Sequence, residues 1–122
     1  MKLIPQILLS AFLVVIIDAI YLNAMKDSFG SMVTSIQRVV MKVKLLPAIL
    51  CYILIIFGLN YFILNKRQGI LEAFLLGFVI YGIFDMTNMA LFKKYKWNLA
   101  IIDSLWGGVL FALTTAIVNA LR

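Results

Sequence analysis

Histidine is absent from this chain of 122 residues, and cysteine and proline are rare, with one Cys and two Pro. The absence of His removes the side chain that most often acts as a general base and binds transition metals. The one cysteine, Cys51, lies inside an apolar run, so an intrachain disulfide and a cysteine-based metal site are both excluded. Nucleotide-binding loops, EF-hand spacing and zinc motifs are also absent. We therefore expect no cofactor.

Charged residues are scarce as well, at 13% of the chain, whereas 65% of the residues are hydrophobic and the mean hydropathy is +1.09. A chain this short cannot bury so much apolar surface in its own core. We therefore predict an integral membrane protein whose partner is the lipid bilayer. The net charge is +6, but the basic residues lie between the apolar runs, where we expect them to contact lipid headgroups and not nucleic acid.

Four apolar runs each have about the 20 residues that a spanning helix needs. They predict a single all-α transmembrane domain over residues 1–122, with helices near 3–24, 45–64, 71–92 and 99–121. Helices are favoured over strands because backbone polar groups in hydrocarbon must be bonded within their own segment. The first run contains Asp18 and no small-residue cleavage pattern, which favours an uncleaved helix over a signal peptide.

The first connection is the longest, and its second half is amphipathic. Between Ser31 and Lys44, apolar residues recur at helical spacing and the basic residues lie mostly at other positions. This pattern predicts a basic helix on the membrane surface between the first two spans. Alternatively, the same residues extend the second span out of the bilayer.

The basic residues also predict an orientation. Four spans place both termini on one side, which carries four basic residues, whereas the other side carries seven. By the positive-inside rule, the first and third connections should be cytoplasmic and both termini should lie on the opposite side. The smaller group is Lys2, Lys66, Arg67 and Arg122, and the larger is Lys26, Arg38, Lys42, Lys44, Lys93, Lys94 and Lys96.

Three aspartates lie within the predicted spans at a similar depth. Asp18, Asp85 and Asp103 should each lie about 6 to 11 Å inside the boundary that faces the first and third connections, because a helix rises 1.5 Å per residue. Burying each aspartate costs on the order of 2.5 to 3.5 kcal/mol, and no Lys or Arg lies in the core of any span. We expect these carboxyls to be protonated, hydrated, bound to a cation, or reached by a lysine at the boundary.

Neutral side chains should surround these aspartates. Tyr81, Asp85 and Asn88 are spaced along one face of the third span, and Asp103 and Trp106 along one face of the fourth. Small residues allow helices in a membrane to approach closely, so Asp85 and Asp103 are predicted to be in contact. The small residues expected at this contact are Gly77, Gly82, Gly107 and Gly108.

The stretch 81–88, followed by Trp97 and then by 103–107, resembles the signature of an uncharacterised family of small predicted membrane proteins. This family is a domain of unknown function with bacterial and large-DNA-virus members. The resemblance covers nearly the whole chain, but the family usually has Trp three residues after its first aspartate, Asp18, where this chain has Tyr21. It implies the same fold and no activity. As important residues it singles out Asp18, Asp85, Asn88 and Asp103.

Two hypotheses for function follow. In the first, the chain handles or transports a proton or a hard cation, which the three aspartates bind with Asn88 and Tyr81 as neutral ligands, while Trp106 lines the layer. Four short helices leave little room for an internal pathway, so a homo-oligomer is expected. In the alternative, the chain is a structural component of a membrane or of a virus particle, and protonated aspartates hold the bundle together. A lipid-modifying enzyme would need a nucleophile or metal that we do not find, although Ser104 adjoins Asp103, so we predict that the chain is not an enzyme.

Overall fold

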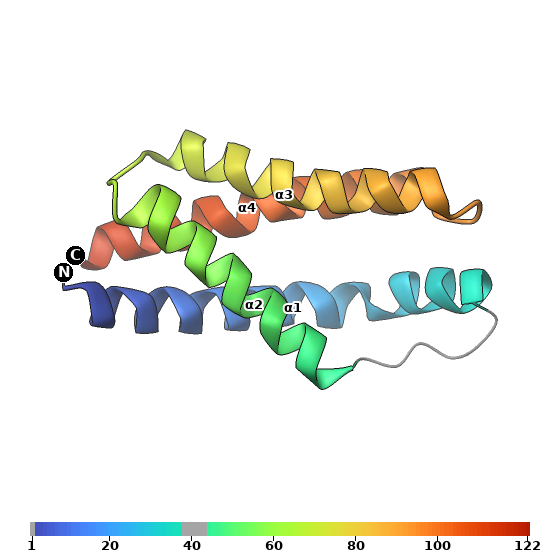
Figure 1. Cartoon of the computed structure of the whole chain (residues 1–122), viewed down its shortest axis with the longest axis horizontal. Coiled ribbons are helices and arrows are strands. Elements are labelled where there is room, and N and C mark those ends of the chain that lie inside the picture. Colours follow the sequence, from blue (N-terminus) through green and yellow to red (C-terminus); the bar gives the residue numbers. More distant parts are fainter. Residues whose placement is uncertain (1, 38–43) are drawn as a thin grey trace.

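The computed structural model describes residues 2–37 and 44–122, and every regular element in these ranges is a helix (Figure 1). Helix α1 covers Leu3–Gln37 and α2 covers Leu45–Leu59, which continues into the short π-helix η1 at Asn60–Leu64. Helix α3 covers Ile70–Leu91 and α4 covers Trp97–Leu121. With η1 counted as the end of α2, each of the four is long and apolar enough to cross a membrane. The predicted all-α architecture with four spans is confirmed.

Helix α1 is much longer than a span. Its 35 residues would extend about 52 Å, whereas the hydrocarbon core of a bilayer is about 30 Å thick. The part after residue 24 packs on the connection between α3 and α4, where Met32 is 1% exposed and contacts Tyr95, Leu99 and Ala100. Residues 31–37 therefore belong to α1 and form no separate surface helix, because protein and not lipid covers their apolar face. The rest of the predicted amphipathic segment, residues 38–43, lies outside the described residues.

Helices α3 and α4 form a tightly packed antiparallel pair. A Cβ atom added to Gly107 would lie 2.6 Å from the carbonyl oxygen of Gly77, and one added to Gly108 would lie 2.6 Å from the ring of Phe74. No larger residue fits at these positions, so the predicted close approach at Gly77, Gly107 and Gly108 is confirmed. The prediction of a close approach is wrong for Gly82, where an added Cβ would be 3.8 Å from the nearest atom, which is an ordinary contact distance.

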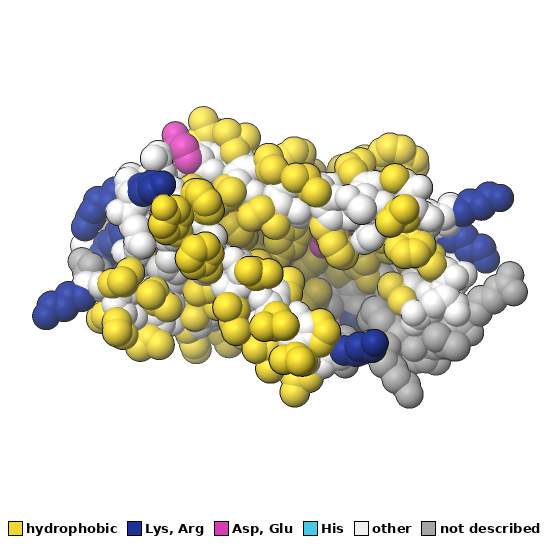
Figure 2. All heavy atoms as spheres, in the orientation of Figure 1, with side chains coloured by type: hydrophobic (Ala, Val, Ile, Leu, Met, Phe, Trp, Pro, Cys, Tyr) yellow, Lys and Arg dark blue, Asp and Glu magenta, His cyan; other side chains and the backbone are white. Residues whose placement is uncertain are grey.

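The other two helices complete the bundle. Helix α1 runs antiparallel to α4, and α2 crosses the bundle obliquely, so both termini lie at the same end (Figure 1). The core between them contains Val14, Leu59, Leu110 and Phe111. Figure 2 shows a surface that is apolar along the length of the helices, with basic side chains at both ends. This distribution is the one expected for helices surrounded by acyl chains, with headgroups at either end.

Candidate functional site

Asp18 lies midway along α1, at the point where α2 and α4 both contact this helix. Its side chain is 5% exposed. Its Oδ2 accepts a hydrogen bond from the hydroxyl of Tyr52 on α2, and its Oδ1 accepts one from Nε1 of Trp106 on α4 at 2.9 Å. Uncharged donors from two other helices thus bind both carboxyl oxygens, so Asp18 connects three of the four spans.

Tyr21 brings a second aspartate next to this contact. Its hydroxyl donates a hydrogen bond to Oδ1 of Asp103 on α4 at 3.0 Å. Its ring stacks on Trp106, with 4.6 Å between the ring centroids and 4° between the ring planes. Since Trp106 donates to Asp18 and Tyr21 donates to Asp103, the stacked pair connects the two carboxyl groups.

Asp85 on α3 is the most deeply buried of the three aspartates, with none of its surface exposed. Its Oδ1 accepts a hydrogen bond from the hydroxyl of Tyr95 at 2.8 Å, and its Oδ2 lies 3.3 Å from the hydroxyl of Ser104. The Ser104 hydroxyl is closer to the carbonyl oxygen of Ala100, at 2.8 Å. A hydroxyl has one hydrogen, so Ser104 can donate to only one of these two acceptors at a time.

The carboxyl groups of Asp85 and Asp103 lie within hydrogen-bonding range of each other, as the sequence predicted. Two carboxyl groups can form a hydrogen bond only when one of them carries a proton, since a carboxylate has no donor. Asn88 hydrogen-bonds to Tyr95, which lies in the connection between α3 and α4. Burial, together with the negative charge of Asp85, raises the pKa of the Tyr95 hydroxyl, so Tyr95 stays a donor at neutral pH.

Tyr81 lies at the contact between α3 and α4. An added Cβ on Gly107 would overlap the Tyr81 ring, so the glycine leaves room for this side chain. Asp18 and Asp103 are the charged groups that act on the Tyr81 hydroxyl. Its role beside the aspartates stays a prediction. We call the group formed by Asp18, Asp85, Asp103 and the side chains that contact them the acid layer.

The acid layer contains no compensating positive charge. Lys93, Lys94 and Lys96 are exposed, and no lysine or arginine forms an ion pair with the three aspartates in residues 2–37 and 44–122. Within the same ranges, no group of three or more acidic or metal-binding side chains is close enough to hold a metal ion. The layer therefore consists of Asp18 on one side and the Asp85 and Asp103 pair on the other, joined by neutral side chains.

A second polar cluster, which was not predicted from the sequence, lies at the other end of the spans. Nε2 of Gln6 donates to Oδ1 of Asn60 at 3.2 Å and to Oδ1 of Asn65 at 2.7 Å. Nδ2 of Asn60 donates to the hydroxyl of Ser10 at 2.9 Å, and Nη1 of Arg122 donates to Oε1 of Gln6 at 2.6 Å. We call Gln6, Ser10, Asn60 and Asn65 the amide network. It joins α1, the end of α2 and the end of α4.

The π-helix η1 explains how two asparagines reach one glutamine. In an α-helix, residues five apart point about 140° away from each other. Here the backbone N–H of Asn65 bonds to the carbonyl oxygen of Asn60 at 2.8 Å, which widens the turn and brings both side chains to the same face. The widened turn thus allows Gln6 to bridge them.

The family described as Predicted membrane protein (DUF2177) matches residues 3–120 of the chain. The chain belongs to the DUF2177 family. No curated protein and no solved structure matches it. The function of the family is unknown, so membership supports a membrane protein of four helices and leaves its activity to be inferred from the site.

In this DUF2177 member, the predicted site residues lie in or beside one layer, whereas several of their partners were missed. Tyr95 adjoins basic residues near a span end, a position typical of an interfacial anchor, so the sequence did not indicate its contact with Asp85. Ser104 was considered only as the neighbour of Asp103 in the sequence, and no pattern in the second span indicated that Tyr52 contacts Asp18. The predicted residues brought together are Asp18, Tyr81, Asp85, Asn88, Asp103 and Trp106, and the missed partners are Tyr21, Tyr52, Tyr95 and Ser104.

Proposed function

We propose that this chain is a proton-handling membrane protein, in which Asp85 and Asp103 hold an exchangeable proton inside the bilayer. The observation that carries this proposal is the contact between the two carboxyl groups, which have no cation beside them within the described residues. Two negative charges in such a site repel each other strongly, so the pair retains one proton and releases it when its surroundings change. Acidic side chains inside membrane helices commonly serve proton transfer.

A proton suits the acid layer better than a hard cation does. Ions such as Ca²⁺ need about six to eight oxygen ligands with their lone pairs directed at the ion. The oxygens of Asp18 instead accept hydrogen bonds from the Tyr52 hydroxyl and from Nε1 of Trp106, and a Trp N–H cannot coordinate a cation. The Tyr21 and Tyr95 hydroxyls occupy one oxygen each of Asp103 and Asp85 in the same way.

Tyr95 is the proposed entry for protons from the aqueous side. It is the one partner of Asp85 that lies outside the spans, and it is covered by Met32 and Leu99. Leu99 also lines a polar pocket at the end of the bundle, so this pocket adjoins the residues that pack with the tyrosine. The pocket is lined by Asp27, Ser28, Ser31, Lys96, Asn98 and Leu99.

We further propose that this end is cytoplasmic and that both termini lie on the opposite side, because the larger group of basic residues is at this end. Passage of protons to the far side needs a second path, since Val14, Leu59 and Phe111 fill the centre of the bundle. A homo-oligomer in which copies adjoin along their apolar faces would supply it.

A structural role is the second candidate. In the acid layer the tyrosine and tryptophan donors of Asp18 and Asp103 come from other helices than the aspartates themselves, so these bonds also hold the bundle together. Interhelical bonds of this kind contribute about 0.6 to 2 kcal/mol each. On this reading the aspartates are permanently protonated, and replacement by asparagine preserves both assembly and function.

Proton flux into proteoliposomes under an imposed pH gradient tests the proposal. The native chain should conduct protons, and Asp85→Asn and Asp103→Asn should each abolish the flux, because an amide cannot release a proton. Glu72→Gln likewise replaces a carboxyl group by an amide, at an exposed position at the start of α3 and far from Tyr95, and should leave the flux intact. Absence of flux from native protein that is folded and monodisperse would instead favour the structural role.

A further inference from the structure

Two arginines meet at the end of the bundle that is opposite the acid layer. Nη1 of Arg122 donates to Oε1 of Gln6 at 2.6 Å and to the carbonyl oxygen of Leu64 at 3.1 Å. The backbone N–H of Arg67 donates to the same Leu64 oxygen at 3.2 Å. The Arg122 guanidinium therefore lies against the turn that follows η1, and Arg67 is part of that turn.

The guanidinium group of Arg122 is held in place with much of its capacity unused. Arginine has five N–H donors in a planar fork. Both of these bonds use Nη1, which leaves the N–H groups on Nη2 and Nε for a ligand. Gln6 is itself fixed by Asn60 and Asn65, so the amide network orients the guanidinium before any ligand binds.

Neither arginine has an acidic partner. Glu72 is the one acid at this end of the bundle, and among the described residues no ion pair joins it to Arg67 or Arg122. Burial, together with the positive charge of Arg67, lowers the pKa of Arg122. Two like charges that approach each other without a carboxylate between them are stabilised when an anion binds both.

The backbone of Arg67 ends the helix. Its φ angle is 52°, and it is the only residue other than glycine with a positive φ in the described part of the chain. The N–H of Arg67 bonds to the Leu64 oxygen and the N–H of Gln68 bonds to the Ile63 oxygen at 2.9 Å, which are the bonds of a Schellman motif. Glycine adopts this conformation without steric cost, so the backbone alone would favour glycine at position 67.

From these contacts we propose that Arg67 and Arg122 bind a phosphate group, of the type carried by an anionic lipid headgroup. Guanidinium groups bind phosphate oxygens through paired hydrogen bonds, and arginine does so better than lysine because its donors are planar. The site lies where a span ends, at the level of the headgroups.

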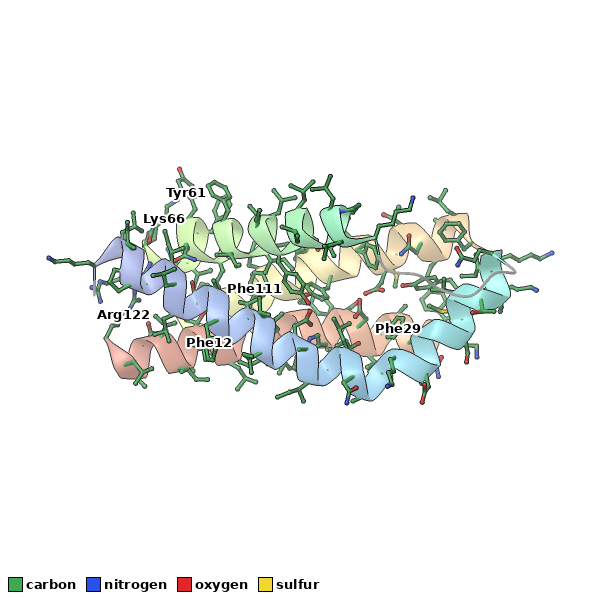
Figure 3. The ribbon with its side chains drawn as sticks, turned by 90° about the horizontal axis from the view of Figure 1, so that it is seen from below. Phe12, Phe29, Tyr61, Lys66, Phe111 and Arg122 are labelled. Carbon is green, nitrogen blue, oxygen red and sulfur yellow. The ribbon has the colours of Figure 1, made fainter. Side chains whose placement is uncertain are left out.

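Lys66, on the same turn, packs over Tyr61 with its Nζ 4.7 Å from the ring centroid. Figure 3 shows both residues beside one another at the end that carries Arg122. An aromatic belt of this type marks the interface of a membrane. This proposal does not depend on proton handling.

Binding of short-chain phosphatidic acid to the purified full chain, measured by native mass spectrometry, tests the site. Arg67→Gln and Arg122→Gln should each weaken binding by about tenfold, the loss expected for a charge-assisted hydrogen bond. Lys66→Gln removes one positive charge from the same turn and should change the affinity by less than about twofold, as for other exposed charges. An equal loss in Lys66→Gln, or no binding by the native chain, would overturn the proposal.

Two further measurements distinguish a lipid headgroup from free phosphate as the ligand and test the role of the Arg67 side chain. Inorganic phosphate that competes at the concentration at which the lipid binds would assign the site to free phosphate, and weaker competition would assign it to the headgroup. Arg67→Gly relieves the strained backbone, so we expect it to unfold at a higher temperature than the native chain while losing phosphatidic acid binding. Retained binding in this variant would contradict a role for the Arg67 side chain.

Discussion

The two polar clusters of this bundle differ in charge. The acid layer contains three carboxyl groups and only neutral donors, whereas the amide network contains no carboxyl group and ends at the guanidinium of Arg122. Gln6 and Asp18 lie at the two depths on α1, about 18 Å apart along its axis. Each cluster contains buried polar side chains, so burial and polarity alone do not distinguish the two. The buried members are Gln6, Ser10 and Asn60 in the amide network and Asp18 and Asp85 in the acid layer.

They also differ in whether their protons have fixed positions. In the amide network each donor has one clear direction, from Arg122 to Gln6, from Gln6 to Asn60, and from Asn60 to Ser10. The serine hydroxyl then donates to the carbonyl oxygen of Ile7 at 3.0 Å, which ends the chain. No alternative arrangement of these protons satisfies the same atoms. The amide network therefore stabilises the contacts between helices and holds the Arg122 side chain in place.

The acid layer has no such single arrangement. The proton between Asp85 and Asp103 can lie on either carboxyl group, and the Ser104 hydroxyl can turn toward Asp85 or toward Ala100. Moving one proton changes the donors and acceptors around it, which is the condition for transfer along hydrogen-bonded groups. A proton with two possible positions, and not the burial of polar groups, therefore distinguishes the candidate working site from the structural contacts.

The largest effect should come from separating α3 and α4. Gly107→Leu would place a side chain against the Gly77 carbonyl and the Tyr81 ring, so we expect destabilisation of about 3 kcal/mol or more and loss of the Asp85 and Asp103 contact. Unfolding in detergent followed by circular dichroism measures this change. Gly82→Ala is the matched control, because the added Cβ would be 3.8 Å from its nearest neighbour. Equal losses in both variants would show that the close glycine contact is not what holds the pair.

Removing the centre of the amide network should destabilise the protein without affecting proton flux. Gln6→Leu removes the hydrogen bonds that Gln6 makes to Asn60, Asn65 and Arg122, and a buried polar group that loses a partner costs about 1 to 3 kcal/mol. Thermal unfolding and proteoliposome flux should be measured on the same preparation. We expect a lower unfolding temperature, weaker phosphatidic acid binding and native flux per folded molecule. A flux that fell with Gln6→Leu in folded protein would mean that the two clusters are coupled.

Tyr95→Phe tests the proposed entry to the acid layer. It removes one hydrogen bond to Asp85 and keeps the ring that packs on Met32 and Leu99, so the cost in stability should be about 1 kcal/mol. The proton flux should nevertheless fall, because the hydroxyl is the link between Asp85 and the connection outside the spans. The control is Tyr61→Phe, an exposed tyrosine at the other end. Native flux in Tyr95→Phe would place the entry elsewhere.

Composition and the rise of a helix were enough to predict four spans and the common depth of Asp18, Asp85 and Asp103. The continuation of α1 to Gln37 was not predicted, because it depends on packing of Met32 against the α3 and α4 connection, a contact between distant parts of the chain. Basic residues nearby made the same segment resemble a surface helix. The depth of a residue can thus be read from the sequence, but what covers it cannot.

The partners of the aspartates show the same limit. Tyr52 reaches Asp18 because α2 crosses the bundle obliquely, and no periodicity within α2 encodes that crossing. The amide network was missed because its members are far apart in the sequence and because Asn60 and Asn65 share a face only in a π-helix. The contact of Gln6 with both asparagines depends on a local irregularity of the backbone, which the sequence pattern did not indicate.

The smallest effect is expected between the two clusters, at Thr114 and Thr115 on α4. Both side chains are fully buried, and their hydroxyl oxygens have no hydrogen-bond partner within the described part of the chain. A buried hydroxyl without a hydrogen-bond partner does not stabilise the fold, so replacing it by the methyl group of valine breaks no hydrogen bond. Thr114→Val and Thr115→Val should therefore leave the free energy of unfolding unchanged or raise it by less than about 1 kcal/mol. Their proton flux should also be native if the acid layer works without them. Loss of flux in folded Thr114→Val would instead show that a water bound at this hydroxyl connects the two clusters, and the centre of the bundle would then belong to the path.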